Sequence, residues 1–476
     1  MNTDNDYKRG LKDRHIQLIA LGGIIGSGYF LGTGEIIHKV GPSVCLAYIF
    51  GGLIVYLTML CMGELAVAIP ISGSFITYTN NLISPVIACG VGWSYWFSWV
   101  AYIPAECIAG GIIMQHFTTI NGYFWAVGFG LLITYINIAK VGTFGEIEFW
   151  LALIKILALI GFVLVAILIF FGLIHGPQPS GIIGNKFIFA QGGLFPRGEM
   201  ALVTAMVLLL VNYQGSEIIG LAAGESINPR RMIPRAIRSV TFRIIFIYII
   251  PIFCLVLIFP WQKANLINSV FADALNFYGL HWAAIATSFV TLIATLSCSN
   301  SGVYGIVRSL QALACHDMAP KKLAILNHNA VPQNAGIVTL FAIWILLAMS
   351  YFCGQSVLYI ALLLVSGFTG TITWISLCWG QINFRRALYK AGYTTADLQY
   401  TTPGYPYTGI AAIILMVSCL IFLLLNQDVT YKIAFIISLI CFIVPTVFYS
   451  FSIMYKGQKT KQLEFKEIFH KYKEYK

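Results

Sequence analysis

Long apolar stretches separated by short polar segments make up the chain from about residue 15 to residue 455. Each is long enough to cross a bilayer as a helix, which takes about 20 residues. Helices are expected rather than barrel strands, because the runs do not alternate polar with apolar residues. We predict twelve transmembrane helices, at about 15–39, 44–69, 86–115, 122–138, 150–173, 199–223, 240–260, 281–313, 336–353, 356–382, 407–425 and 431–455.

Composition agrees with lipid as the solvent. Of the 476 residues, 58% are hydrophobic and 10% are charged, and the mean hydropathy is +0.81. A soluble domain averages about 25% charged residues, so the chain is expected to be an all-α integral membrane protein. The 11 cysteines are scattered through apolar runs without the spacing of metal ligands. We therefore expect no disulfide framework, no metal site and no cofactor.

The basic residues predict the orientation. With an even number of spans both termini share one side, and most of the 29 Lys and Arg residues then fall on that side. The other side receives Lys39, Lys186, Arg197, Lys263 and Lys432. Because cytoplasmic segments carry the excess of Lys and Arg, both termini are predicted to be cytoplasmic, in the cell inner (plasma) membrane. The basic tail at 456–476 is then an anchor beside membrane lipid, and nucleic acid is not an expected partner.

These boundaries divide the chain into seven parts. They are a cytoplasmic N-terminal segment (1–14), a first five-helix repeat (15–173), an extracytoplasmic loop (174–198), a second, inverted five-helix repeat (199–382), a cytoplasmic loop (383–406), helices 11 and 12 (407–455) and the basic cytoplasmic tail (456–476).

Glycines interrupt the first predicted span. The stretch GGIIGSG, residues 22–28, places four glycines inside an apolar run, where glycine weakens a helix. A break there exposes backbone N–H and C=O groups in the membrane, and these are tolerated only if they face protein, water or a ligand. The N–H groups suit a carboxylate and the carbonyls suit an ammonium, so one broken helix matches both ends of a zwitterion. Close helix packing through small residues is the alternative explanation.

The sixth predicted span carries a second interruption. Within VLLLVNYQGSEIIGLAAGES, five residues interrupt an otherwise apolar helix, namely Asn212, Gln214, Gly215, Ser216 and Glu217. The first and sixth spans correspond if the first ten spans form two five-helix repeats, and the odd number inverts the second repeat. Interrupted helices at matching places in two halves indicate the binding site of a transporter. The repeat is inferred from these positions, since the halves show no direct sequence identity.

Several ordered motifs carry a family resemblance. They are GGIIGSGYFLGTG, GELAVAIPISGSFITY, GEIEFWLALIK, YQGSEIIGLAAGES with NPRRMIPRAIR, and LSCSNSGVYGIVRSL. Together they resemble the amino acid–polyamine–cation superfamily of permeases, within it the bacterial proton-coupled transporters of lysine, aromatic amino acids, γ-aminobutyrate and S-methylmethionine. The resemblance runs from about residue 11 to about residue 406. It implies a LeuT-like fold of five plus five inverted helices with two further helices, and alternating access around a site between the first and sixth helices.

Lys155 lies within the fifth span, about five residues or ~8 Å from its start. Snorkelling of the side chain to the cytoplasmic surface is one explanation. The other is that its ammonium stands where sodium-coupled relatives bind a cation against carbonyls of the first helix. The resemblance favours this second explanation, which assigns proton coupling to Lys155 and names the proton gradient as the energy source.

Other charged residues fall inside the spans, where each needs a partner or a role. Glu217 either accepts hydrogen bonds from the unwound first helix or titrates during transport. Glu106, in the third span, handles the proton, packs helices or attracts a cationic substrate, and these alternatives stay open. Arg243, Arg308 and Glu64 lie near cytoplasmic ends and can snorkel, and we interpret all three as structural or gating residues.

The expected substrate site joins the two breaks. Ile25, Gly26, Ser27 and Gly28 are assigned to the carboxylate of an amino acid, and Asn212, Tyr213, Gln214 and Gly215 surround its amine and side chain, with Tyr213 as an aromatic gate. Glu106 and Ser297 are further candidates, and Cys298, Asn300, Ser366 and Thr369 are more speculative ones.

The sixth-span motif most resembles the lysine and S-methylmethionine permeases, so a cationic amino acid such as lysine is the first choice of substrate. A permease for neutral or aromatic amino acids, an exchanger and a nutrient sensor remain alternatives. An enzyme is not expected, because the sequence shows no nucleophile elbow, metal-ligand spacing or nucleotide fingerprint. A channel is disfavoured, because no filter repeat is visible. The oligomeric state is left open.

Overall fold

The computed structural model of the chain is helical. It describes residues 25–70, 73–138, 144–174, 192–218, 220, 234–235, 237, 240, 242, 244–327 and 331–456. Every regular element in this part of the chain is a helix, as the continuous apolar runs predict. Short 3₁₀ or π segments are labelled η.

The principal elements follow in chain order. They are η1 (Gly28–Gly32), α2 (Thr33–Val40), η2 (Gly41–Ser43), α3 (Val44–Ala68), α4 (Ser74–Leu82), α5 (Pro85–Gln115), α6 (Gly122–Ile138), α7 (Phe144–Phe170), α9 (Glu199–Leu210), η3 (Val211–Tyr213), η5 (Ile244–Ile249), α12 (Ile250–Ile258), η6 (Trp261–Lys263), α13 (Val270–Phe277), α14 (His281–Cys315), η7 (Lys321–Ala324), α15 (Gln333–Cys353), α16 (Gln355–Lys390), η8 (Thr395–Asp397), α17 (Tyr407–Leu423) and α18 (Val429–Lys456).

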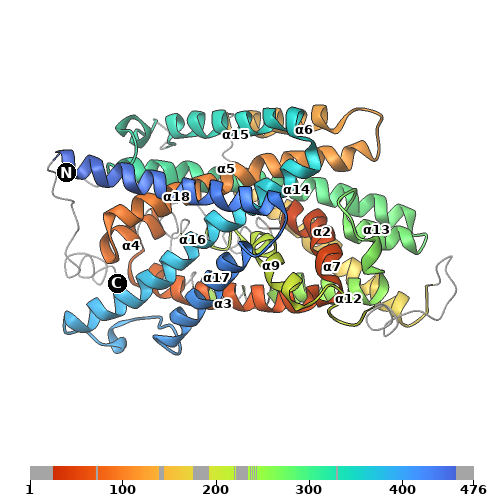
Figure 1. The fold of residues 1–476 in the computed structure, drawn as a ribbon, viewed down its shortest axis with the longest axis horizontal. Coiled ribbons are helices and arrows are strands. Elements are labelled where there is room, and N and C mark those ends of the chain that lie inside the picture. Colours follow the sequence, from red (N-terminus) through yellow and green to blue (C-terminus); the bar gives the residue numbers. More distant parts are fainter. Residues whose placement is uncertain are drawn as a thin grey trace.

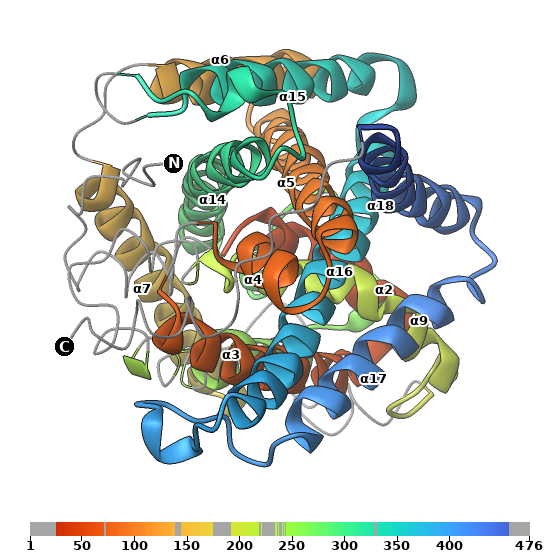
Figure 2. The same cartoon turned by 90° about the vertical axis from the view of Figure 1, so that its left-hand side faces the viewer.

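Helix α5 lies at the centre of the bundle. It packs against α16, α14, α6, α18 and α4, and its most apolar stretch is 89% buried. Helices α6 and α15 run side by side as an outer layer (Figures 1 and 2). The peripheral α18 is only 11% buried over its apolar stretch. Polar residues on α5 are therefore shielded from the surroundings, whereas those on the outer helices are not.

Exposed apolar side chains cover the outer helices. On α6, Phe124, Leu131 and Tyr135 are 65%, 58% and 71% exposed, and Phe341 on α15 is 67% exposed. Helices apolar on every side are buried in a large core or lie in lipid. Such an outer surface is expected of an integral membrane protein, whose hydrocarbon surroundings match it.

The described helices follow the predicted spans closely. Seven helical stretches in this part of the chain are long and apolar enough to cross a membrane, and four apolar helices are shorter. Each of the twelve predicted spans overlaps at least one described helix. The number that cross the bilayer and the inverted repeat stay predictions, in part because the first 24 residues lie outside the described chain.

Three features differ from the sequence prediction. The short helices α4 and α13 were not predicted, because each is shorter than a span and amphipathic. Helix α16 continues to Lys390, eight residues into the segment 383–406 that we predicted to be a loop. Apolarity ends at Ile382, but a helix has no reason to stop where it leaves the hydrocarbon, and Arg385 on this extension is buried against other helices.

A buried ion pair joins α16 to α3. Arg385 donates to both carboxylate oxygens of Glu64, through Nε to Oε1 and through Nη2 to Oε2, the latter at 2.8 Å. The N–H of Thr402 also donates to Glu64, and its hydroxyl donates to the Leu60 carbonyl at 3.0 Å. Glu64 is 0% exposed, so its side chain does not snorkel in this structure, and the ion pair agrees with the structural role that we considered for it. Bidentate charge-assisted bonds of this kind fix geometry.

Removing one member of this pair is expected to destabilise the fold strongly. Arg385→Met leaves the Glu64 carboxylate buried and unpaired, which costs about 3–5 kcal/mol. The double variant Glu64→Gln with Arg385→Met should recover part of that loss, because no buried charge remains. Thermal unfolding of the detergent-solubilised variants measures both effects.

Lys390→Met, an exposed position on the same helix, serves as the control and should unfold at the native temperature. Equal melting temperatures for Arg385→Met and Lys390→Met would contradict the assignment of this pair as a structural clamp.

Candidate substrate and proton site

The described chain begins within the first break that the sequence predicts. Ile25 and Gly26 are not helical, and helical structure starts at Ser27. The N–H of Ser27 donates to both carboxylate oxygens of Glu106, at 3.0 and 2.9 Å. This backbone donor thus binds the carboxylate of Glu106 on α5, whereas we predicted that it binds the carboxylate of a substrate. A substrate carboxylate at this position has to share or displace the Glu106 contact. Gly22 and Gly23 lie outside the described residues.

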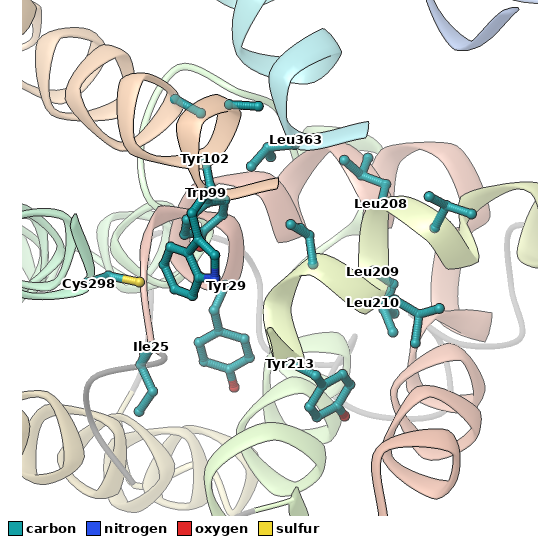
Figure 3. Packing of buried hydrophobic residues seen from close by; sticks show 14 of the residues in the cluster. Ile25, Tyr29, Trp99, Tyr102, Leu208, Leu209, Leu210, Tyr213, Cys298 and Leu363 are labelled. Carbon is teal, nitrogen blue, oxygen red and sulfur yellow. The ribbon is translucent and has the colours of Figure 1, made fainter. Parts of the chain in front are cut away.

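Gly26 permits this close approach. A methyl group added at Gly26 would collide with Oε1 of Glu106 and would lie 2.8 Å from the Tyr102 hydroxyl and 3.0 Å from Cys298 Sγ. Trp99, Tyr102 and Cys298 gather near this part of the chain (Figure 3). The break is therefore enclosed by side chains of α5 and α14, and glycine is needed for steric reasons.

The second break follows α9. The helix tightens into η3 and ends at Tyr213, and Gly215 adopts a φ of +93°, which favours glycine. Glu217 accepts from the Gly215 N–H with both oxygens at 3.0 Å and from Trp374 Nε1 at 3.0 Å. These donors lie on the sixth-span break itself and on α16. Among described residues, Glu217 thus braces the sixth break, and the role that we predicted for it at the first break stays a prediction, because residues 22–24 lie outside the described chain.

The two breaks lie against each other. Elements η1 and η3 are in contact, as are α2 and α9. A methyl group added at Gly28 would collide with Asn212 Oδ1. Asn212 Nδ2 donates to the Tyr48 hydroxyl at 2.7 Å, while its Oδ1 is buried and has no hydrogen-bond partner among the described residues. An unpaired buried acceptor beside the first break is suited to an ammonium donor.

Tyr213 and Gln214 are held by neighbouring helices. The Tyr213 ring packs 4.6 Å from the Tyr248 ring, and its hydroxyl donates to the Tyr48 carbonyl at 2.8 Å. Figure 3 shows Tyr213 apart from the Trp99 and Tyr102 side chains. Gln214 Nε2 donates to the Ser366 carbonyl at 2.7 Å. In this conformation both side chains join helices together, and the gate role of Tyr213 stays a prediction.

Lys155 reaches inward to the first break. Its Nζ donates to the Ile25 carbonyl at 3.2 Å and to Ser297 Oγ at 2.8 Å, and the residue is 0% exposed. The side chain therefore does not snorkel to the surface. Its ammonium occupies the place where a freed carbonyl of the first span would otherwise bind a cation. Burial of an ammonium is costly unless its donors are paired, and both of these acceptors lie at predicted functional positions.

Comparisons with known proteins identify the family. The amino acid permease family profile matches residues 15–463. The chain belongs to the amino acid permease family. It is 37% identical to the amino-acid permease RocC of Bacillus subtilis, over 90% of this chain and 91% of the relative. It is 36% identical to the lysine-specific permease LysP of Escherichia coli, over 87% of this chain and 85% of the relative.

A solved structure supports the fold. A mutant form of the manganese transporter of Eremococcus coleocola superimposes with a TM-score of 0.60 at 12% identity, covering 99% of each chain. At this identity the likeness concerns the fold alone. The protein is thus an integral membrane permease of a transporter family and not an enzyme.

The remaining predicted residues of the permease are placed as follows. Ser297 contacts Lys155 rather than the backbone of either break. Asn300 accepts from Asn137 of α6 at 3.1 Å, so it faces an outer helix. Ser366 donates to Gln214 Oε1 at 2.8 Å, and the Thr369 hydroxyl bonds the Val365 carbonyl in its own helix at 2.7 Å. Of these four side chains, Ser297 is thus the one that the described bonds connect to Lys155.

Sequence reasoning missed a buried acid. Glu148 on α7 is 0% exposed and accepts from the Ser297 hydroxyl. It lies seven residues before Lys155 in GEIEFWLALIK, a spacing that places both side chains on one face of a helix. That spacing could have identified it. Tyr359, whose hydroxyl donates to Ser27 Oγ at 3.2 Å, carried no such signal, because an aromatic residue in an apolar span is common.

Proposed function

We propose that the permease is a secondary active transporter that takes up an amino acid together with a proton. It works by alternating access, with the substrate held between the first and sixth breaks. Both termini are cytoplasmic, in the cell inner (plasma) membrane. Of the possible substrates, a cationic amino acid such as lysine is preferred.

The contact from Lys155 Nζ to the Ile25 carbonyl carries this proposal. A protonated Lys155 ties α7 to the first break, and loss of its proton weakens that tie, because a neutral amine is a weaker donor. Protonation then biases the permease between two arrangements of the first break. A ligand shifts an equilibrium between two conformations only by the difference in its affinity for each. Here the proton on Lys155 is bound more tightly in the conformation in which Lys155 contacts the Ile25 carbonyl.

Two observations support a zwitterionic substrate. The Ser27 N–H already binds a carboxylate, that of Glu106, so the break has the chemistry to bind a substrate carboxylate. Asn212 Oδ1 lies beside Gly28 as an unpaired acceptor for the α-ammonium group. When a substrate carboxylate takes the Ser27 N–H, Glu106 is released. It can then pair with a cationic side chain, and the lysine-specific relative supports that class of substrate.

A neutral substrate is the second candidate. Glu106 is already bonded to backbone N–H in this structure, so its carboxylate is not waiting unpaired for a cation. If that bond persists during transport, the site accepts neutral or aromatic amino acids. Exchange and nutrient sensing remain further alternatives.

Uptake into proteoliposomes distinguishes these candidates. We expect radiolabelled lysine to accumulate when the outside is more acidic, and unlabelled lysine or arginine to compete more strongly than leucine or phenylalanine. Liposomes without protein provide the background. Competition by neutral amino acids alone would exclude the cationic substrate, whereas uptake indifferent to the pH gradient would exclude proton coupling.

A further inference from the structure

We propose that Glu148 exchanges the transported proton between Lys155 and the cytoplasmic side, with the Ser297 hydroxyl as the bridge. This inference rests on the proposed proton coupling and adds a route for the proton. Helix α7 begins on the predicted cytoplasmic side, and Glu148 lies seven residues before Lys155. At 1.5 Å per residue, the backbone of Glu148 is about 10 Å closer to the cytoplasm than that of Lys155, and the Lys155 side chain spans most of this distance to reach Ser297.

The three side chains form a continuous hydrogen-bonded chain. Lys155 Nζ donates to Ser297 Oγ at 2.8 Å, and Ser297 Oγ donates to Glu148 Oε1. A hydroxyl accepts and donates at the same time, so Ser297 can receive one proton while it gives up another. All three residues are at most 1% exposed. Proton transfer between Lys155 and Glu148 therefore needs no large side-chain movement.

At the cytoplasmic end of these hydrogen bonds, two buried polar atoms lack partners among the described residues. Glu148 Oε2 is buried without a hydrogen-bond partner among the described residues, and so is the hydroxyl of Ser301, one turn further along α14. The Ser301 hydroxyl is near enough to stabilise the Glu148 carboxylate, but neither atom meets the criteria for a hydrogen bond among the described residues. A buried unsatisfied carboxylate oxygen is costly, and acceptance of a proton from Lys155 or of a water from the cytoplasm would satisfy it.

Acidic groups on two sides of Lys155 can accept its proton. Its ammonium interacts electrostatically with Glu148 on its own helix, with Glu106 on α5 and with Cys298 on α14. Glu106 lies at the first break, where we propose that the substrate binds, whereas Glu148 lies toward the cytoplasm. Around Glu148 the interacting groups are Lys155, Ser297 and Ser301. The permease thus has one acid on each side of the lysine, as a relay requires.

The transfer balances in protons and charge. An N–H bond of the Lys155 ammonium breaks as an O–H bond forms on Ser297, and the original Ser297 O–H bond breaks as one forms on the Glu148 carboxylate. The products are a neutral amine, an unchanged hydroxyl and a carboxylic acid. Glu148 then releases the proton to cytoplasmic water and returns to the carboxylate.

Two transport assays test the relay. Accumulation driven by a pH gradient requires net proton release, whereas exchange of internal for external substrate does not. Glu148→Gln keeps the size and hydrogen-bonding capacity of the side chain but cannot take the proton as a carboxylate. We expect gradient-driven uptake to fall at least about tenfold, because proton transfer by a positioned side chain contributes roughly 100-fold or more to its step. Exchange should be retained.

Further variants keep the result interpretable. Ser297→Ala should give the same pattern, Glu148→Asp should restore part of the gradient-driven uptake, and the exposed control Glu199→Gln should behave as the native permease. Native gradient-driven uptake by Glu148→Gln would overturn the relay, as would loss of both activities together, which would indicate a structural role. If instead uptake by the unmodified permease does not depend on the pH gradient, the proposed proton coupling itself is wrong, and that result is independent of the variants.

Discussion

Replacing Lys155 with alanine is expected to remove the pH-gradient dependence of uptake. A gradient of one pH unit supplies about 1.4 kcal/mol per proton, enough for about tenfold accumulation if one proton accompanies each substrate. The variant lacks the ammonium that bonds the Ile25 carbonyl and Ser297. Its accumulation ratio should therefore fall to about one, a tenfold loss per pH unit. Radiolabelled lysine uptake at several imposed gradients measures the change.

Lys321→Ala is the matched control, since the Lys321 side chain is 85% exposed and its removal deletes a charge of the same kind outside the membrane. Uptake by this control should keep its dependence on the gradient. If Lys155→Ala retained an unchanged pH dependence, Lys155 would have no part in coupling.

Replacing Gly26 with alanine is expected to reduce uptake strongly. The added methyl group meets the Glu106 carboxylate, the Tyr102 hydroxyl and Cys298 Sγ, so the first break and α5 have to separate. Overpacking of this kind costs about 1–3 kcal/mol. It also breaks the bonds from Ser27 N–H to Glu106. We expect transport to fall by at least about tenfold, which corresponds to about 1.4 kcal/mol.

Gly161→Ala on α7 isolates the steric effect. No atom lies within 4 Å of a methyl group added there, and alanine favours a helix over glycine by about 1 kcal/mol. This control should transport normally and unfold at an equal or higher temperature. Native uptake by a folded Gly26→Ala variant would show that the close approach of Glu106 is not needed.

The predictions for Lys155 and Gly26 both concern the backbone of the first break. Lys155 bonds the carbonyl of Ile25, and Glu106 bonds the N–H of Ser27, two residues further along. The first break therefore has a cation on its carbonyl and an anion on its amide. The ammonium and carboxylate groups of a zwitterionic substrate could bind the same carbonyl and amide. We therefore expect substrate binding and protonation of Lys155 to affect each other.

Much of the fold was predictable from local pattern. Apolar runs predicted helices at every position where the structure has a long one, and the span 122–138 has the same bounds as α6. The glycines and polar residues of the two breaks predicted where regular helix ends, and η3 with Gly215 confirms the second break. These features depend on neighbours in sequence, so periodicity and backbone preference suffice to find them.

The partners of the buried charges were not predictable in the same way. A carboxylate at Glu106 is equally compatible with a substrate, a proton or a backbone amide as its partner, and only the packing of α5 on the first break assigns it to Ser27. Glu64 pairs with Arg385, which lies 321 residues away, so no local pattern could indicate this ion pair. Ser297 was expected to bind substrate, yet the meeting of α7 and α14 places it between Lys155 and Glu148.

By itself the sequence determined that this is a helical membrane protein of the amino acid permease family, and it predicted helices broken at two places by glycine and polar residues. Hydropathy and motif spacing are sufficient to predict these properties, because each property depends on residues close together in the sequence. Only the tertiary structure decided which groups meet at the breaks. A hydrogen bond depends on a separation of about 3 Å, and for segments a hundred or more residues apart that separation is set by how the helices pack.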